Sequence, residues 1–584
     1  MEESTVHRHA QEEYHVVGEG IVGQDGQGAP CRRRPTTVER ERRFQFSRLG
    51  PQGGADLDDA VLQAVAEAMT APTVEHADAD GVPAGYTYLG QFVDHDLTKD
   101  VTGKALGTEL TVEALLQGRS PTLDLDSLYG RGPWHLYDRK YYSGDAHLRM
   151  GVTAGSPFPP ADPVAQADQP GFDLPRVGVD PTRPQTAADK RAPLIPDARN
   201  DENLAVAQTH LAFIRFHNRV VDTLAADGVA EDDLFEQARR IVVRHYQWMM
   251  ATDYLPRICD PAVVEDVFTH GRRFFEADAP YPACRPTMPI EFSVAAFRLG
   301  HSQVRGRYQW NRVFSTGGPG GPATLLQLFA FSGVSGALDN LSLQQLDEPD
   351  ASPESLRLPS NWIADFGRLY DFAEAQRPEL TPDGGPDRAK RIDTGLVDPL
   401  AQLPAGSFGG RAPEAPSTAM QRNLAFRNLK RAAMVDLASG PQLAAMMQVE
   451  PLTREQVLTG AGDVVVTGLS TEQADALVER TPLWFYVLRE AELNGGRLAG
   501  VGARIVAEVF HRAMEGSCTS IVREPGWRPA LGPDEDTFRM VDLLLHAADG
   551  RAEVINPLGT AAPAPVAPAP RAPGDEPVRL SPVA

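Results

Sequence analysis

Apolar residues recur at helical spacing along most of the interior of the chain. In segment 202–226 they are three, four or seven positions apart, which places them on one face of a helix. Segments 233–258, 289–304 and 482–496 show similar patterns, whereas strand-like alternation is rare. We therefore predict a mainly α protein, with one large helical domain and few short strands. The apolar positions of the first segment are Leu204, Ala207, Leu211, Ile214, Val221 and Leu224.

The two ends of the chain differ in composition from this interior. Residues 1–44 are polar and include a basic cluster, and residues 557–584 are rich in proline and alanine. Such segments bury too little apolar surface to pack stably. We expect an N-terminal arm at 1–44 that is partly disordered or wraps the surface. The domain would then occupy 45–556, followed by an extended tail at 557–584.

Charge and cysteine content exclude several classes of protein. The formal net charge of -23 leaves no strong basic field for binding nucleic acid. No apolar run is long enough to span a bilayer, so we expect no transmembrane segment. The N-terminus lacks the pattern of a secretory signal, and the four cysteines are scattered. Both features favour a cytoplasmic protein.

The stretch Tyr88–Thr98, YLGQFVDHDLT, places three titratable residues in an apolar setting. Burying an unpaired charge is costly, so each of them needs a partner. In a helix, Gln91, Asp94 and His95 share one face because they are three and four residues apart. Asp96 lies well off that face, which predicts a different partner for it. The alternative is a helix with a solvated acidic side and a satisfied histidine.

A row of oxygen-bearing side chains follows in segment 119–130, RSPTLDLDSLYG. Residues two apart in an extended segment point the same way, so their oxygens line one side. These hard donors suit Ca²⁺ better than a transition metal, although the spacing excludes an EF-hand. A turn with solvated aspartates is the alternative. The residues are Ser120, Thr122, Asp124 and Asp126.

Three further motifs carry polar residues with ordinary explanations when each is taken alone. Arg199 and Glu202 are three apart at a helix start, where ion pairing or capping is common. His301 ends an apolar stretch, as a satisfied core histidine often does. Asn428 lies on an apolar helix, where an amide usually bonds the backbone or a helical neighbour.

In their order and identities, these motifs resemble the animal-type haem peroxidases of the peroxidase–cyclooxygenase superfamily, in a bacterial-like form. The resemblance spans roughly residues 85–440 and begins at YLGQFVDHDLT, its most specific motif. It continues through LDLDSLYG, ARNDEN, THLAFIRFHNRVVD, ATDYLP, AAFRLGH, RIDTGLVDPL and RNLKR. It implies a helical domain built around a buried haem b.

The resemblance also implies a catalytic role for three residues. His95 matches the distal histidine, which takes a proton from bound hydrogen peroxide and returns it to the departing oxygen. Arg199 matches the distal arginine, which stabilises the negative charge developing as the O–O bond breaks. Gln91 matches the glutamine that holds water or a halide above the iron. The implied enzyme oxidises small donors through a ferryl intermediate, with iodide, bromide and thiocyanate as candidate donors.

Other matched residues would hold the haem. His301 matches the proximal iron ligand, and Asn428 matches the asparagine that accepts its other ring N–H. Arg431 matches an arginine beside a haem propionate. Asp94 and Glu202 match the two carboxylates that form ester bonds to the haem in mammalian members. The resemblance therefore implies that the haem can be attached covalently.

A calcium site is also implied. Asp96 matches a calcium ligand of the family, and calcium bound there would hold the neighbouring His95 in place. The family commonly has serine at the position of Asp126, so this loop carries an additional negative charge. The companion ligands would be Ser120, Thr122 through its hydroxyl and carbonyl, Asp124 and Asp126.

Two other functions compete with the peroxidase. Fatty-acid oxygenases of the same superfamily use a tyrosine three residues before the proximal histidine, whereas this chain has Arg298, as peroxidases do. A non-catalytic haem- or calcium-binding adhesion module would not need His95, Arg199 and Gln91. The peroxidase is therefore favoured, while the sequence leaves the electron donor and the oligomeric state open.

Overall fold

The computed structural model describes residues 44–559 apart from 55, 73–80, 103, 105, 180–181, 183, 186, 279–285, 335–355 and 404–419. It also describes the backbone at 15–16, 20–24 and 30–33. The disorder expected for the arm and for the tail from residue 560 onward lies outside these residues.

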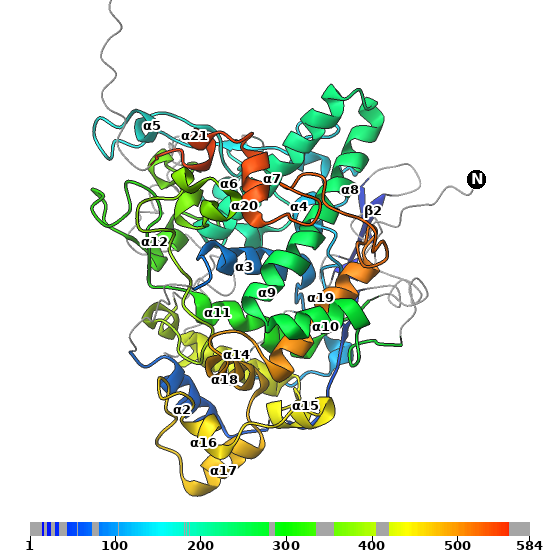
Figure 1. Cartoon of the computed structure of the whole chain (residues 1–584), viewed down its shortest axis with the longest axis vertical. Coiled ribbons are helices and arrows are strands. Elements are labelled where there is room, and N and C mark those ends of the chain that lie inside the picture. Colours follow the sequence, from blue (N-terminus) through cyan, green and yellow to red (C-terminus); the bar gives the residue numbers. More distant parts are fainter. Residues whose placement is uncertain are drawn as a thin grey trace, which may run out of the picture.

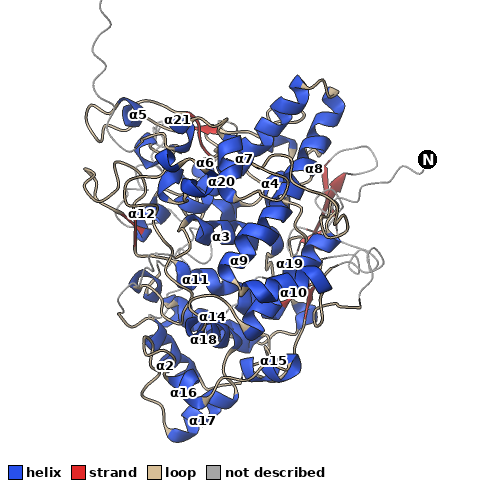
Figure 2. Ribbon diagram, in the orientation of Figure 1, coloured by secondary structure: helices blue, strands red, loops and turns tan. Residues whose placement is uncertain are grey.

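Helices make up about half of the described chain, and Figure 2 shows how little of it is strand. Many are short and are joined by single 3-10 turns. The α-helices are α2 (Asp59–Met69), α3 (Gly85–Leu97), α4 (Asp126–Tyr129), α5 (Pro163–Gln166), α6 (Ala187–Arg191), α7 (Leu204–Ala226), α8 (Glu231–Met249), α9 (Leu255–Ile258), α10 (Pro261–His270), α11 (Gly300–Gln303), α12 (Leu325–Ala330), α14 (Leu424–Met434), α15 (Gly440–Met447), α16 (Arg454–Leu458), α17 (Thr471–Glu479), α18 (Leu483–Leu493), α19 (Gly500–Gly516), α20 (Met540–Ala547) and α21 (Ala552–Ile555).

The strands are short and pair in small separate sheets. β1, β2 and β3 form an antiparallel sheet, β4 pairs with β7 in parallel, and β5–β6 and β8–β9 are antiparallel pairs. The mainly α fold with few short strands is thus confirmed. Their bounds are β1 (His15–Val16), β2 (Gly20–Gln24), β3 (Pro30–Arg33), β4 (Phe46–Ser47), β5 (Gly151–Val152), β6 (Pro170–Asp173), β7 (Met288–Pro289), β8 (Arg307–Tyr308) and β9 (Ala323–Thr324).

Helix α3 lies in the middle of the molecule, beside α7 (Figure 1). Phe92 of α3 stacks on Phe213 of α7, with ring centroids 4.5 Å apart. Tyr246 of α8 meets the edges of both rings, at 6.5 and 5.7 Å. This aromatic contact fixes α3 against α7 through Phe213, which is not among the apolar positions predicted for that helix. One continuous apolar core runs from Leu57 to Leu558.

Two of the segments expected to be single helices contain breaks. The 233–258 segment forms α8 and α9, joined by a π-helical turn at Met250–Tyr254. A π-helical turn contains more residues than an α-helical turn. This turn lies just before Pro256, which has no backbone N–H to donate. In the 289–304 segment, a π-turn at Glu291–Ala295 leads into a 3-10 turn and then into α11. These breaks end each helix beside the central cavity described below.

The start of α3 depends on the absence of a side chain at Gly85. A Cβ built there would meet the ring of Tyr370, which is fully buried. We predict that Gly85→Ala lowers the free energy of unfolding by about 1–3 kcal/mol, because the core must shift to admit the methyl group. The midpoint of urea unfolding measures this. Gly526→Ala is the control, because its Cβ would meet nothing within 4 Å. Equal midpoints for the two variants would contradict the packing described.

Candidate active site

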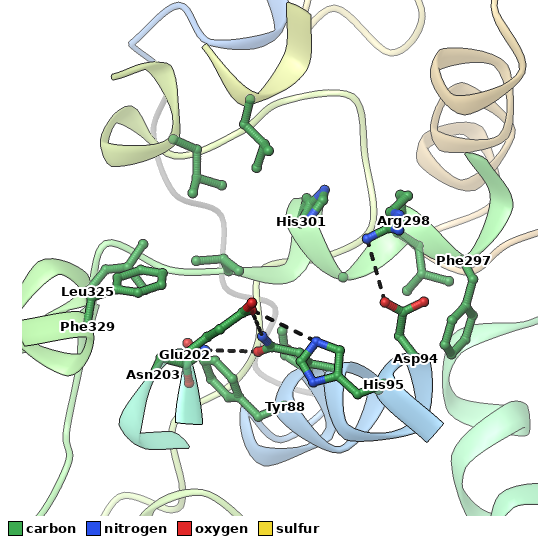
Figure 3. A pocket seen from close by; sticks show the side chains of 18 of the residues that line it. Tyr88, Asp94, His95, Glu202, Asn203, Phe297, Arg298, His301, Leu325 and Phe329 are labelled. Carbon is green, nitrogen blue, oxygen red and sulfur yellow. Dashed lines mark hydrogen bonds and ion pairs between the residues drawn. The ribbon is translucent and has the colours of Figure 1, made fainter. Parts of the chain in front are cut away.

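A cavity of about 200 Å³ lies between α3 and α11. His95 and His301 line opposite walls of this cavity (Figure 3). The wall around His95 is polar, and the end of the cavity farthest from Asp94 is apolar. Leu325 and Phe329 lie at that end, and the lining of the cavity also includes Leu400, Leu403 and Leu424.

The polar wall is built from α3 and the start of α7. Gln91 Nε2 donates to Glu202 Oε2 at 3.3 Å, and Gln91 Oε1 accepts from Asn203 Nδ2 at 2.9 Å. Glu202 Oε2 also lies 3.9 Å from His95 Nε2. Asn203 caps α7 by accepting the Val206 N–H. Gln91 therefore has both ends of its amide fixed, and the Glu202 carboxyl is held beside the His95 ring.

Burial controls the charge of both titratable groups on this wall. It lowers the pKa of His95 to about 4, and the nearby positive charge of Arg199 lowers it further in the same direction. Burial also raises the pKa of Glu202 to about 7. His95 is consequently a neutral imidazole at physiological pH, which is the form that can accept a proton.

Arg199 lies behind the polar wall rather than on the lining of the cavity. Its guanidinium forms a two-bond pair with Asp197, through Nε at 3.0 Å and Nη2 at 2.8 Å. Nη2 also donates to the carbonyl oxygen of His95 at 3.0 Å. Asp197 is paired with Arg119 as well, and these positive charges hold its pKa well below the usual range. Arg199 is thus a fixed charge close to His95.

The opposite wall comes from α11, with support from α14. Asn428 Nδ2 lies 3.0 Å from His301 Nδ1, so turning this amide by 180° would bring its oxygen there to accept a ring proton. The Trp484 indole meets the His301 ring edge-on, with centroids 6.4 Å apart. Burial and the charge of Arg298 lower the pKa of His301 to about 3. His301 is therefore neutral and turned toward the cavity, as a metal ligand must be.

Asp94 occupies the end of the cavity near Arg298. Its Oδ2 lies 3.6 Å from Arg298 Nη1, and its Oδ1 accepts from Thr98 Oγ1 at 3.0 Å. Arg298 also lines a neighbouring cavity of about 90 Å³, together with Arg427 and Arg431. The structure thus places Arg431 next to the main cavity, where these cationic groups could meet an anionic part of a ligand.

Asp96 faces away from the cavity and has separate partners. Its two oxygens accept the N–H groups of Ser127 at 3.1 Å and Leu125 at 3.2 Å. Leu125 adopts a left-handed conformation with φ of 58°, which turns the loop toward Asp96. Burial raises the pKa of Asp96 to about 7. Two backbone N–H groups therefore link the loop at 120–126 to α3.

The remaining oxygen donors of this loop are buried together. Thr122 Oγ1 donates to Asp124 Oδ2 at 2.9 Å, and Ser120 Oγ lies 2.5 Å from Thr122 Oγ1. Asp126 Oδ1 has no hydrogen-bond partner among the described residues, and Arg239 Nη2 is 3.9 Å away. Burial and the charge of Asp124 raise the pKa of Asp126 to about 8. Within the described ranges, no three His, Cys, Asp or Glu side chains are grouped to hold a metal ion.

The structure adds residues that sequence reasoning missed. Asn200 and His210 lie directly behind His95, where Asn200 Oδ1 contacts His95 Nδ1 at 2.8 Å. Asn200 stands inside the ARNDEN motif, but nothing in its spacing indicates that it faces α3. In the part of the chain with described structure, no helix is both long and apolar enough to cross a membrane.

Comparison with known proteins gives matches in sequence and in fold. The family model described as animal haem peroxidase matches residues 102–327, a range that includes Arg199 and His301. Thyroid peroxidase of Mus musculus is 29% identical over 198 residues, which cover 32% of this chain and 19% of that protein. The human thyroid peroxidase is 28% identical over 201 residues with the same coverage. The chain thus matches about a fifth of the length of these relatives.

Two solved structures share the fold over most of the chain. Peroxidase A from Dictyostelium discoideum aligns with 91% of this chain and 99% of its own, with a TM-score of 0.51 and 14% identity. A fatty acid alpha-dioxygenase from Arabidopsis thaliana aligns with 90% of this chain and 82% of its own, with a TM-score of 0.53 and 12% identity.

The chain shares the fold of these two solved structures. Its sequence match is more specific, because it lies with the peroxidases: residues 102–327 match the animal haem peroxidase family.

Proposed function

We propose that the protein is a haem-dependent peroxidase that reduces hydrogen peroxide and oxidises small donors. The observation that carries this proposal is the pair of neutral histidines, His95 and His301, on opposite walls of one cavity. Each has its Nδ1 in contact with an asparagine, which leaves Nε2 for the cavity. One histidine can hold an iron while the other acts on a ligand of that iron.

The residues of the cavity fit a haem. An apolar end formed by leucines and Phe329 suits the porphyrin, and Arg298 and Arg431 beside the cavity suit its propionates. His301 would be the iron ligand, because Asn428 contacts its Nδ1 and can fix its tautomer. Bound haem would supply the iron that binds peroxide and stores the oxidising equivalents.

The residues around His95 suit the handling of protons. The neutral imidazole can take a proton from a peroxide held beside it and return the proton to the departing oxygen. Gln91, fixed by Glu202 and Asn203, presents a polar group to a small ligand in the cavity. Arg199 contributes as a charge that keeps His95 neutral, because its guanidinium is committed to Asp197 and to the His95 carbonyl.

Arg298 favours a peroxidase over a fatty-acid oxygenase. Oxygenases of this superfamily form a radical on a tyrosine at that position, whereas a guanidinium yields no such radical. The Arabidopsis thaliana dioxygenase is 12% identical to this chain in sequence, so its structural similarity supports the fold alone. Small anions such as iodide, bromide and thiocyanate remain the candidate donors, and a panel of them with H₂O₂ would rank them.

The two histidine roles lead to a first prediction. His301→Ala should abolish the Soret band of the purified protein, because the iron loses its ligand. His95→Ala should keep the band but slow the reaction with H₂O₂ by about 10²–10⁴-fold, through loss of the general base. Stopped-flow spectroscopy measures both. If His95→Ala loses the Soret band and His301→Ala keeps it, the roles assigned to the two histidines are wrong.

Covalent attachment through Asp94 and Glu202 is part of the proposal. Both carboxyl groups line the cavity, and Figure 3 shows them on either side of His95. Burial disfavours the charged form of Glu202, whereas an ester there would carry no charge. Forming each ester oxidises a haem methyl group, so the bond would require turnover with H₂O₂.

Acid–acetone extraction after treatment with H₂O₂ tests this attachment. We expect the wild-type haem to remain with the protein, and the haem of the Asp94→Asn, Glu202→Gln double variant to be extracted. Each single variant should retain one link, which mass spectrometry of haem-linked peptides would locate. Complete extraction from the wild type would refute the esters without affecting the peroxidase proposal.

We also propose that Ca²⁺ binds at the loop at 120–126. Three buried carboxylates and two hydroxyls form a hard donor set with excess negative charge, and one of the carboxylate oxygens, Asp126 Oδ1, has no hydrogen-bond partner among the described residues. The donors would have to draw closer around the ion, since they are not grouped as a metal site in the described structure. Binding would favour the ionised form of Asp96 and thereby secure α3.

Calcium content and chelation test this site. We expect about one Ca²⁺ per chain by elemental analysis, and a lower melting temperature after treatment with EGTA. Asp96→Asn should lose the ion, whereas Asp126→Ser, which keeps an oxygen donor, should bind it more weakly. The site would be contradicted if the purified protein contains no calcium and its melting temperature does not change with EGTA.

A further inference from the structure

A buried asparagine connects two histidines that come from different helices. Asn200 Oδ1 lies 2.8 Å from His95 Nδ1, and Asn200 Nδ2 lies 2.9 Å from His210 Nδ1. His95 is 4% exposed, and Asn200 and His210 are both 0% exposed. Neither Asn200 nor His210 lines the cavity. The three side chains therefore form a chain that leads from the cavity into the core.

The chemistry of the amide assigns a proton position to each ring. An amide nitrogen only donates and an amide oxygen only accepts. In the amide orientation of the structure, His210 Nδ1 is the unprotonated acceptor of the Asn200 N–H, and His95 Nδ1 carries a proton that it donates to Asn200 Oδ1. A neutral imidazole that is protonated at Nδ1 has a free lone pair at Nε2, on the side of the cavity.

We propose that Asn200 and His210 are positioning residues that hold His95 in the tautomer with Nδ1 protonated and Nε2 free. This proposal rests on the proposed peroxidase function, because it explains how His95 is ready to accept a proton. The opposite tautomer would present an N–H to the peroxide and could not take its proton. His210 contributes by contacting the amide nitrogen of Asn200 through Nδ1, which holds the amide with its oxygen toward His95.

The location of the three residues supports a positioning role. His95 belongs to α3, Asn200 to the 3-10 turn Ala198–Asp201 and His210 to α7. Phe92 packs edge-on against the His210 ring at 5.7 Å, so this ring is held from two sides. A hydrogen-bonded chain between three fixed elements has little freedom to rearrange. The charged or titratable groups acting on His95 are Asp94, Asp197, Arg199, Glu202 and His210.

The tautomer itself is measured by NMR of protein labelled with ¹⁵N-histidine. The spectra are recorded in a diamagnetic state, either ferrous with carbon monoxide or haem-free as purified. We expect His95 to show a protonated Nδ1 and an unprotonated Nε2, and Asn200→Leu to show a mixture or the opposite tautomer. A protonated Nε2 in the wild type, or no change in Asn200→Leu, would overturn the proposal.

Kinetics against pH provide a second measurement. In Asn200→Leu the reaction with H₂O₂ should slow at least about tenfold while haem binding persists. In Asn200→Asp the new carboxylate stabilises the imidazolium, so the acid limb of the rate profile should move up by about one pH unit or more. An unshifted limb in Asn200→Asp would contradict the contact with His95.

Two further variants separate this role from simple stability. His210→Leu should weaken the tautomer preference, and His210→Gln, which keeps an acceptor for the amide, should restore most of it. Asn218→Leu is the matched control, because Asn218 on α7 is another buried asparagine, which bonds the backbone of Leu148 instead. It should leave the NMR signals of His95 unchanged. If the expected tautomer is found in a protein that shows no reaction with H₂O₂, the peroxidase proposal fails and the tautomer assignment stands.

Discussion

The burial of helix α3 is the constraint on which the candidate site depends. Asp94, His95 and Asp96 are 8%, 4% and 0% exposed, and a buried polar group without a partner costs free energy. Successive residues of a helix point in different directions, so the three groups need partners on different sides. Arg298 serves Asp94, Asn200 serves His95, and the loop before α4 serves Asp96. The partners of these three residues of α3 thus bring together the cavity, the asparagine behind His95 and the acidic loop at 120–126.

An asparagine contacts the histidine on each wall of the cavity, and the other neighbours of the two histidines differ. His95 and His301 each have an asparagine at Nδ1. Around His95, Gln91 and Glu202 supply groups that bind small polar molecules. Around His301, the Trp484 ring packs edge-on and the charge of Arg298 acts together with burial to disfavour the imidazolium. Under the proposed function, the difference between a proton acceptor and an iron ligand would come from such neighbours rather than from the histidines themselves.

The sequence predicted the fold class and the members of the site better than it predicted their arrangement. The spacing in YLGQFVDHDLT separates Asp96 from Asp94 and His95, because that separation follows from helical geometry alone. The π-turns before α9 and α11 were missed, because the apolar spacing of each segment is equally compatible with an unbroken helix. Asn200 was missed for a similar reason: its contact with His95 joins residues 105 positions apart, and no local pattern encodes it.

Arg199 matches the arginine of the motif, but its guanidinium is bound to Asp197 and does not line the cavity. A guanidinium aimed into the cavity would stabilise negative charge on a ligand directly. Here Asp197 binds it in a two-bond pair, and Arg119 balances the charge of Asp197 from the other side. The positive charge consequently acts on His95, where it disfavours the imidazolium. The pairing with Asp197 therefore decides which group this guanidinium acts on, and in this arrangement that group is the His95 imidazole.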